Sequence, residues 1–308
     1  MRYVFIVNPT AGKGNLQEKI INRINNYFAA HEGSYKIEIT QCRGDARLIS
    51  RREAETGDKV AIFACGGEGT SFEVINGVYG FENAAVGVIP CGSANDFLKY
   101  FGGNDAFSDI ENQISGSVCR MDLIKAGNDY CLNGCSAGMD AMVAHDMVLF
   151  KRWPFVSGSA AYKLAIVKTF MRRLGITVNI KIDGEDKGKK RCLFAVIANA
   201  PFYGGGYMGA PDAVPNDGML DFTQVGMIKR LHIPKFLSLY QKGRHGSLKA
   251  CSMQRCKKFE FVSEKPIPVN MDGEIVFADS MSFEIVPDAI NFLLPKTVAE
   301  QSKILTNF

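Results

Sequence analysis

The sequence contains no apolar run that approaches the roughly 20 residues needed to span a bilayer. The short apolar run at residues 3–7 stops at Pro9 and Gly12, and it lacks the length and the cleavage site of a secretory signal. These absences exclude a membrane-spanning architecture and argue against secretion. We therefore expect a soluble, cytoplasmic protein that meets a membrane, if at all, from one side only.

Paired cysteines and a strong charge of one sign are also missing. The nine cysteines include no Cys-x-x-Cys pair, which argues against a zinc knuckle and a disulfide framework. The net charge is only +4, far from the dense basic surface of a dedicated nucleic-acid binder. With 46% hydrophobic and 22% charged residues, the 308-residue chain has an ordinary globular composition and is long enough for two domains. It shows no internal repeat and no low-complexity segment.

The first 120 residues alternate short β-rich runs with helical stretches, which predicts an α/β domain with a parallel sheet. Strands are expected at residues 3–7, 36–40, 60–64 and 85–89, and helices at 16–30, 46–56, 70–78 and 94–100.

After residue 120 the pattern changes to short strands linked by turns, which predicts a mostly antiparallel β-sandwich over residues 121–287. The expected strands are 122–126, 176–182, 191–198, 258–262 and 281–286, with a helix at about 160–173. The tail at 288–308 contains an apolar segment, 290–295, beyond the last expected strand, and we expect it to pack back on the first domain.

Three glycine-rich turns follow expected strands of the first half, where an open α/β sheet places its ligands. The first, residues 8–14, has small residues that let backbone N–H groups approach a phosphate, but it does not have the spacing of a Walker A loop. The second, residues 64–70, has three glycines within four residues and a single carboxylate, Glu68. A carboxylate beside phosphates implies a bridging cation or a role in proton transfer. The third, residues 90–97, carries Ser93, which could equally be an ordinary helix N-cap.

Together these turns resemble the diacylglycerol kinase family of lipid kinases. The resemblance runs nearly the whole length and rests on Asn8-Pro9, the glycine turn that continues to Asn76-Gly77, and the segment 90–97. It implies a nucleotide-binding α/β domain, a C-terminal β-sandwich domain, and transfer of a phosphoryl group from ATP with Mg²⁺ to a lipid hydroxyl. The implied ATP contacts are Asn8, Pro9, Thr10, Ala11, Gly12, Thr40, Gly66, Gly67, Glu68, Gly69, Thr70, Ser71, Phe72 and Ser93, with Asn95 and Asp96 on the substrate side. The family usually has Asp where Glu68 stands, and a displacement of about 1 Å can cost roughly 100-fold in rate.

Two acidic segments of the second half are turns by their local sequence. Residues 210–221 are rich in turn formers, and the resemblance implies a structural Mg²⁺ there, held by Asp217 with the carbonyl groups of Val214 and Met219. Asp272-Gly273 between two β-prone runs predicts a hairpin. The resemblance implies that Glu274 accepts the proton of the lipid hydroxyl and that Asp272 binds metal or orients the base, while Glu68 is a rival for the base.

The lipid side of the predicted site is less sharply marked. Asp140 resembles a head-group contact of sphingosine-type kinases, although it could equally cap the helix that starts nearby. Residues 147–173 mix aromatic and basic side chains, which suits a membrane interface or a helix with a solvated face. We expect a membrane lipid as partner, a position at the inner membrane surface and no nucleic acid, and we leave a homodimer open. Two alternatives remain: a NAD kinase, and a nucleotide-gated lipid-binding protein without turnover.

Overall fold

The computed structural model describes residues 1–12, 15–91, 95–151, 164–165, 168–169 and 174–301. The chain divides into two compact units: unit 1 comprises Met1–Leu123 and Val286–Phe308, and unit 2 comprises Ile124–Ile285. Two strands carry the chain from one unit to the other, β5 (Ser117–Ala126) and β15 (Glu274–Leu294).

Unit 1 alternates strands and helices as the sequence pattern predicts. The elements are β1 (Arg2–Val7), α1 (Leu16–Ala30), β2 (Tyr35–Ile39), α2 (Asp45–Ala54), β3 (Val60–Gly66), α3 (Glu68–Val78), β4 (Ala84–Pro90), the 3₁₀ helix η1 (Asp96–Phe101), α4 (Asn104–Ser108), α5 (Ile110–Ile114) and α9 (Lys296–Gln301). β1 pairs in parallel with both β2 and β3, and β3 pairs in parallel with β4. The helix expected at 94–100 is wrong in type, because the described part of that segment forms η1.

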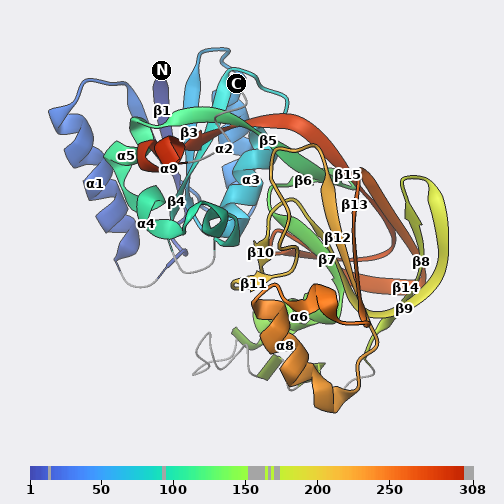
Figure 1. Cartoon of the computed structure of the whole chain (residues 1–308). Coiled ribbons are helices and arrows are strands. Elements are labelled where there is room, and N and C mark those ends of the chain that lie inside the picture. Colours follow the sequence, from blue (N-terminus) through green and yellow to red (C-terminus); the bar gives the residue numbers. More distant parts are fainter. Residues whose placement is uncertain (13–14, 92–94, 152–163, 166–167, 170–173, 302–308) are drawn as a thin grey trace. The chain divides into compact units, whose positions relative to one another are not determined.

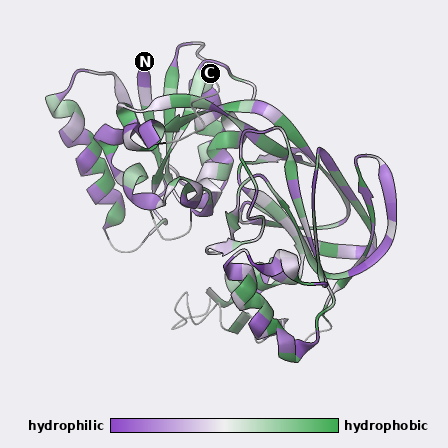
Figure 2. Ribbon diagram, in the orientation of Figure 1, coloured by the Kyte–Doolittle hydropathy of each residue, from purple (hydrophilic) through white to green (hydrophobic). Residues whose placement is uncertain are grey.

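Side chains on the two faces of this sheet pack under different helices. Phe5 and Phe63 stack with centroids 4.8 Å apart, and they share a buried cluster with Ile20 and Ile24 of α1. The helices α2 and α3 pack against each other and lie on the other side of the strands in Figure 1. Figure 2 shows the central strands in green and much of the outer side of α1 in purple, as expected of strands buried on both faces.

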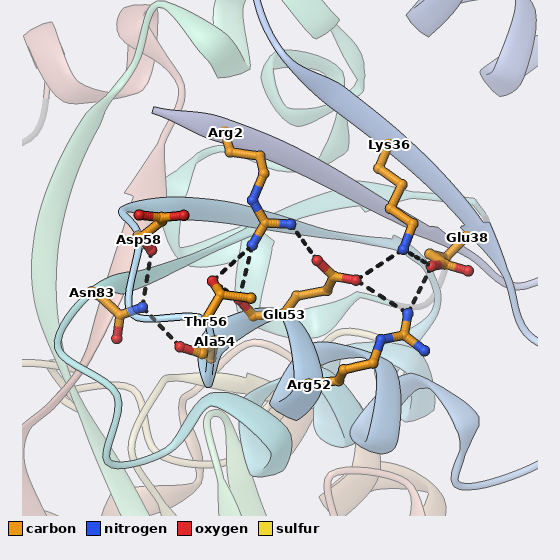
Figure 3. Close-up of polar contacts among 9 residues, drawn as sticks. All are labelled: Arg2, Lys36, Glu38, Arg52, Glu53, Ala54, Thr56, Asp58 and Asn83. Carbon is orange, nitrogen blue, oxygen red and sulfur yellow. Dashed lines mark hydrogen bonds and ion pairs between the residues drawn. The ribbon is translucent and has the colours of Figure 1, made fainter.

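A charged network closes the amino-terminal edge of the unit 1 sheet. Glu53 of α2 is 5% exposed and pairs with Arg2, Lys36 and Arg52 (Figure 3). These partners hold the pKa of Glu53 down to about 2 against the opposing effect of burial. Because Arg2 begins β1, the network lies at the opposite end of the strand from Asn8.

Unit 2 is built mainly from antiparallel strands. Its elements are β6 (Asp129–Cys131), β7 (Gly134–Gly138), α6 (Met139–Lys151), β8 (Ile176–Ile182), β9 (Glu185–Ala198), β10 (Phe202–Tyr203), β11 (Tyr207–Met208), β12 (Leu220–Gly226), η2 (Arg230–His232), α8 (Ile233–Gln241), η3 (His245–Ser247), β13 (Cys251–Cys256) and β14 (Lys258–Met271). Each of β9 and β14 pairs with β8 along one part and with β7 along another. The helix expected at 160–173 lies largely outside the described residues.

The sequence pattern suggested a parallel sheet for the first half, and the pairings among β1, β2, β3 and β4 are parallel. Within unit 2 the first part of β15 pairs antiparallel with β14, and within unit 1 its last part pairs parallel with β4. The apolar tail segment is not a separate element beyond the last strand. It forms the end of β15, where Asn291 and Phe292 pair with Ala85 and Val86.

Candidate functional site

The parallel strands of unit 1 bring three predicted segments to one edge of the sheet. The Asn8 N–H donates to the Cys65 carbonyl at 3.0 Å, and the Cys91 N–H donates to the Gly66 carbonyl at 3.0 Å. The Thr40 N–H donates to the Val7 carbonyl at 3.0 Å, which adds the end of β2 to the same edge. The first loop, the glycine turn and the start of the third segment therefore lie side by side, because the carboxyl ends of parallel neighbours meet.

Side chains tie the first loop to the glycine turn. Asn8 Nδ2 donates to Thr70 Oγ1 at 3.0 Å, while Asn8 Oδ1 accepts from the N–H and the hydroxyl of Thr10 at 3.0 and 2.8 Å. Pro9, Thr10 and Gly12 are exposed, and Ala11 is half-buried. The loop thus has a fixed backbone and an exposed surface.

Glycine is required at two positions where the loops approach closely. A Cβ on Gly66 would lie 2.3 Å from Thr70 Oγ1. A Cβ on Gly12, whose φ is +84°, would lie 2.6 Å from the Cys91 carbonyl oxygen. At Gly67, in contrast, an added Cβ would have no neighbour within 4 Å among the described residues. The space beside Gly67 is therefore open, and the backbone there can be approached by a ligand.

The start of α3 offers the chemistry of an anion site. Gly67 is the N-cap residue and provides no side chain to cap the first-turn amides, and Glu68 is the first residue of the helix. Thr70, Ser71 and Phe72 are buried in the following turn. Uncapped amides and the positive end of a helix favour phosphate oxygens.

Glu68 also contacts the third segment. Its Oε1 accepts the backbone N–H of Asp96 at 3.1 Å. The Asp96 side chain is 1% exposed and pairs with Lys99 at 2.6 Å, while Asn95 is buried with its Nδ2 unpartnered among the described residues. Ser93, predicted as an ATP contact, lies outside the described residues.

Sequence reasoning missed the role of Glu73. Its two carboxylate oxygens accept the backbone N–H groups of Gly44 and Ala46 at 2.8 and 3.1 Å, while Asp45 accepts those of Gln41 and Cys42 at 2.6 and 3.0 Å. These bonds fix the loop that follows Thr40. An acidic residue one turn inside α3 gave no local signal, because its partners come from another helix.

Asp272 lies in the two-residue turn that joins β14 to β15, and Glu274 is the first residue of β15. Met271 pairs with Glu274, and both turn residues have positive φ, 46° at Asp272 and 95° at Gly273. The Asp-Gly hairpin prediction is therefore confirmed. The carboxylate of Asp272 accepts backbone N–H groups from Leu132 at 2.6 Å, Asn133 at 3.1 Å and Gly134 at 2.8 Å. Burial raises the pKa of Asp272 to about 6, and these three amides oppose that rise.

Asp140 is the second residue of α6 and lies in a buried polar cluster of unit 2. Neither carboxylate oxygen accepts a hydrogen bond of regular geometry among the described residues, although the hydroxyls of Ser136 and Tyr203 are near enough to stabilise its charge. Burial raises the pKa of Asp140 to about 6. Tyr203 and Tyr240 share a hydrogen bond of 2.8 Å beside it. Sequence reasoning missed both tyrosines, because they come from β10 and α8.

The acidic loop before β12 contains an ion pair that the sequence pattern did not indicate. Arg255 pairs with Asp217 and lies 3.7 Å from Asp221 Oδ2, since Arg255 and Asp221 are directly opposite in the β12–β13 register. Burial, Asp217 and Asp212 raise the pKa of Asp221 to about 6, while Arg255 opposes the rise.

Asp217, which the resemblance implies as a Mg²⁺ ligand, has protein partners in this structure. Arg255 already engages one oxygen of Asp217, and the other oxygen accepts the backbone N–H of Met219 at 3.1 Å. The predicted ligand set of Val214, Asp217 and Met219 combines one carboxylate with two backbone carbonyl groups, and it stays a prediction.

Comparison with protein-family models decides which family this chain represents. Residues 2–126 match the diacylglycerol kinase catalytic domain. Residues 133–294 match the YegS C-terminal NAD kinase beta sandwich-like domain. The chain belongs to the diacylglycerol kinase family. It is a kinase, and its second half has the β-sandwich-like domain of that family.

Similar sequences cover most of the chain. A Shewanella frigidimarina protein named "Probable lipid kinase YegS-like" is 30% identical over 256 residues, which cover 81% of this chain and 80% of that protein. A Bacillus subtilis diacylglycerol kinase is 26% identical over 304 residues, which cover 96% of this chain and 97% of that enzyme. The three glycine-rich turns and the acidic hairpin thus lie in a chain that aligns with the Bacillus subtilis enzyme over nearly its whole length.

Solved structures show the same fold. A diacylglycerol kinase from Bacillus anthracis matches with a TM-score of 0.68 at 19% identity, covering 96% of this chain and 98% of that one. A NAD kinase from Archaeoglobus fulgidus in complex with ATP matches with a TM-score of 0.52 at 13% identity, covering 98% of this chain and 96% of that one. At these identities the likeness concerns the fold alone.

Proposed function

We propose that this kinase transfers the γ-phosphoryl group of ATP to a hydroxyl group of a membrane lipid. The observation that carries the proposal is the joining of the first loop, the glycine turn and the third segment at one edge of the unit 1 sheet, linked by Asn8, Thr70 and Glu68. Family membership supports the reaction class, and the names of the relatives support a lipid acceptor.

In this proposal unit 1 binds the triphosphate. The open backbone at Gly67 and the uncapped start of α3 bind phosphate oxygens, and the exposed Pro9, Thr10 and Gly12 cover the nucleotide from the first loop. The Asn8–Thr70 hydrogen bond keeps the two loops in register, so the amides are ordered before ATP arrives. Backbone amides that are already in position need not reorient while the phosphoryl group is transferred, so no free energy is lost in reorganising them.

Mg²⁺ enters this proposal as part of the nucleotide substrate, with which it neutralises charge on the phosphates. Glu68 fits that task, since a carboxylate beside phosphate-binding amides suits a hard cation with oxygen ligands. The Asp96 N–H holds Glu68 Oε1 at 3.1 Å and so limits the orientations of its carboxylate.

For the proton of the lipid hydroxyl we propose Glu274 as the base, with Glu68 as the alternative. Glu274 is half-buried and directly follows the rigid Asp272-Gly273 turn, so its backbone position is fixed. Asp272 is a positioning residue in this account, because its oxygens are engaged by three backbone amides and are poorly available to a metal. Removing a general base typically costs 10²- to 10⁴-fold in rate.

For the lipid head group we propose Asp140. Asp140 is a buried carboxylate whose polar neighbours are the hydroxyls of Ser136 and Tyr203 and the backbone N–H of Ala141, and it could accept hydrogen bonds from hydroxyl groups of a lipid head group. The neighbouring Tyr203 and Tyr240 hydroxyls would add polar contacts of the same kind.

The acceptor is tested by offering lipids and NAD together. The protein would be incubated with γ-labelled ATP, Mg²⁺, mixed lipid vesicles and NAD, and the labelled products separated by thin-layer chromatography. We expect label in the lipid fraction, and a survey of diacylglycerol, sphingoid, ceramide and phosphatidylglycerol acceptors then identifies the substrate. Label in the dinucleotide with lipids ignored would replace the proposal with a NAD kinase.

The base is tested by two conservative substitutions. Glu274→Gln should lower kcat by about 10²-fold or more with ATP affinity retained, because the amide cannot accept the proton. Near-normal turnover in Glu274→Gln, together with a large loss in Glu68→Gln, would assign the proton to Glu68. Glu68→Asp tests the departure from the family pattern: a higher rate would show that the longer side chain holds this enzyme below its optimum.

A further inference from the structure

Positive charge is concentrated in one stretch of unit 2. Residues 222–259 contain nine of the 36 Lys and Arg residues and none of the 32 Asp and Glu residues. Removing this +9 from the net charge of +4 leaves −5 for the rest of the chain. The modest net charge of the protein therefore conceals a basic stretch of sequence, in which Arg255 and Lys258 pair with acidic residues outside it and the other cations include Lys229 and Lys235.

The same stretch carries the most exposed large apolar side chain among those described. Leu231 lies in η2 and is 92% exposed, and Met227 four residues earlier is 41% exposed. Lys229, His232 and Lys235 surround Leu231 in sequence and are exposed as well. Burial normally stabilises an apolar side chain, so packing within unit 2 does not explain why Leu231 is exposed.

The exposed residues stand on a rigid base. The buried face of α8 consists of Ile233, Phe236 and Tyr240, and Phe236 and Tyr240 pack against Phe194 with ring centroids 6.1 and 5.4 Å away. Ile233 is completely buried, although it is only two residues after Leu231. The segment is thus anchored at its α8 end. This helix, orange in Figure 1, shows both hydrophilic and hydrophobic residues in Figure 2.

We propose that residues 227–235 form a docking segment that holds the protein on an anionic lipid bilayer. Leu231 and Met227 would enter the acyl boundary, while Lys229 and Lys235 would pair with anionic head groups. An apolar tip ringed by cations has the chemistry of an interfacial anchor, which combines apolar burial with electrostatic attraction. The proposed lipid acceptor is the reason for choosing a bilayer over an acidic protein, and to that extent this inference rests on the proposed function.

This segment differs from the region whose composition suits a membrane interface or a helix with a solvated face. Aromatic and basic residues at 147–173 suggested a membrane interface, but most of that region lies outside the described residues. None of the helices in the described part of the chain is long and apolar enough to cross a membrane. Attachment by a docking segment would deliver the protein to its substrate from one side of the bilayer.

The test measures binding without nucleotide, so that it is independent of catalysis. The full chain would be floated with vesicles of phosphatidylcholine alone and of phosphatidylcholine mixed with phosphatidylglycerol, at low and high salt. We expect binding to the mixed vesicles that weakens as salt rises. Leu231→Asn should weaken it by roughly tenfold, and Lys229→Gln with Lys235→Gln by a similar factor.

Matched variants control for the loss of any exposed leucine or lysine. Leu48 on α2 is 66% exposed, and Lys59 and Lys125 are exposed outside the docking segment. Leu48→Asn, and Lys59→Gln with Lys125→Gln, should bind vesicles as the native chain does. Native affinity in Leu231→Asn, or native binding to neutral vesicles without salt dependence, would overturn the proposal.

A second readout separates docking from the reaction. Leu231→Asn should lose phosphorylation of a lipid presented in vesicles but retain phosphorylation of a short-chain, water-soluble analogue. Vesicle binding by a native protein that phosphorylates only NAD would keep the docking segment and remove the lipid kinase proposal. Equal losses on both acceptors would instead assign Leu231 to catalysis and contradict docking.

Discussion

Asp272 and Gly134 exchange two hydrogen bonds between the β14–β15 turn and the start of β7. The Asp272 N–H donates to the Gly134 carbonyl at 3.1 Å, and the Gly134 N–H donates to Asp272 Oδ1 at 2.8 Å. With Leu132 and Asn133 also bound to the carboxylate, Asp272 fixes the backbone from which Glu274 and β7 both extend.

Asp272→Asn should lower the free energy of unfolding by roughly 1–3 kcal/mol. The amide has one acceptor oxygen in place of two, and its NH₂ group would face backbone N–H groups that the carboxylate now accepts. Urea denaturation measures the loss, with the exposed Asp279→Asn as the control. A positioning role also predicts a lower kcat with an unchanged pH profile. Native stability combined with an altered pH profile would mean that Asp272 itself takes part in proton transfer.

Two neighbouring glycines should respond differently to the same substitution. Gly66→Ala places a Cβ 2.3 Å from Thr70 Oγ1 and should destabilise unit 1 by about 1–3 kcal/mol. Gly67→Ala meets no described atom within 4 Å and should fold normally, but its methyl group occupies the space proposed for phosphate. Thermal unfolding and ATP titration separate the two effects. Full ATP affinity in Gly67→Ala would contradict the proposed phosphate site.

The Arg255 ion pairs predict that the stability of unit 2 does not depend on Mg²⁺. The native melting temperature should be the same in EDTA and in Mg²⁺, because Arg255 balances Asp217 and Asp221. Arg255→Gln should lower the melting temperature. Mg²⁺ should restore part of the loss by binding the Asp217 and Asp221 carboxylates, which would then lack their ion-pair partner. The control is Arg191→Gln, which changes an exposed arginine of β9. A native protein that melts lower in EDTA would support the predicted structural cation.

The ion pairs of Glu53 should make the free energy of unfolding of unit 1 depend on pH in the acidic range. Because the folded pKa of about 2 lies below the ordinary 4.5, the stabilisation is complete above pH 4.5 and is lost as the pH falls toward 2. The shift of the Glu53 pKa limits this stabilisation to about 3 kcal/mol. Solvent exposure of the partners Lys36 and Arg52 reduces it further.

Glu53→Gln should therefore be less stable than the native chain at pH 6, and the difference should shrink between pH 4.5 and 2. Urea denaturation at a series of pH values measures it. Glu82→Gln, which removes the exposed partner of Arg120, should cost little at any pH. A difference that stays constant down to pH 2 would show that Glu53 stabilises by packing and not by charge.

Local patterns were sufficient for many elements of the fold. The expected helix 16–30 and strand 176–182 coincide with α1 and β8, because both combine a clear hydrophobic period with turn formers at their ends. The end of β15 could not be predicted in this way, since Pro287 and Asp288 suggest a break. There Asp288 has a φ of 48°, and its N–H is held by Asp122 at 2.9 Å, a partner far away in sequence.

The residues of the candidate site likewise divide into those that the local sequence could predict and those that it could not. Glycine turns after strands are visible locally, and the structure brings the described parts of all three together in unit 1. Glu73, Tyr203 and Arg255 were missed because their partners come from other helices and strands. Arg255 lies opposite Asp221 only through the β12–β13 register, which the local sequence does not reveal. The family resemblance, and not the local pattern, implied a cation at this loop.

The most direct test of the proposed reaction is to determine which phosphate group of ATP is transferred to the lipid. The native chain would be incubated with mixed lipid vesicles and Mg²⁺, in parallel with ATP labelled at the γ or at the α position, and the lipids extracted. The account predicts label in the lipid extract from γ-labelled ATP alone. No label in lipid from γ-labelled ATP, with ATP binding intact, would contradict it and leave a nucleotide-gated lipid-binding protein.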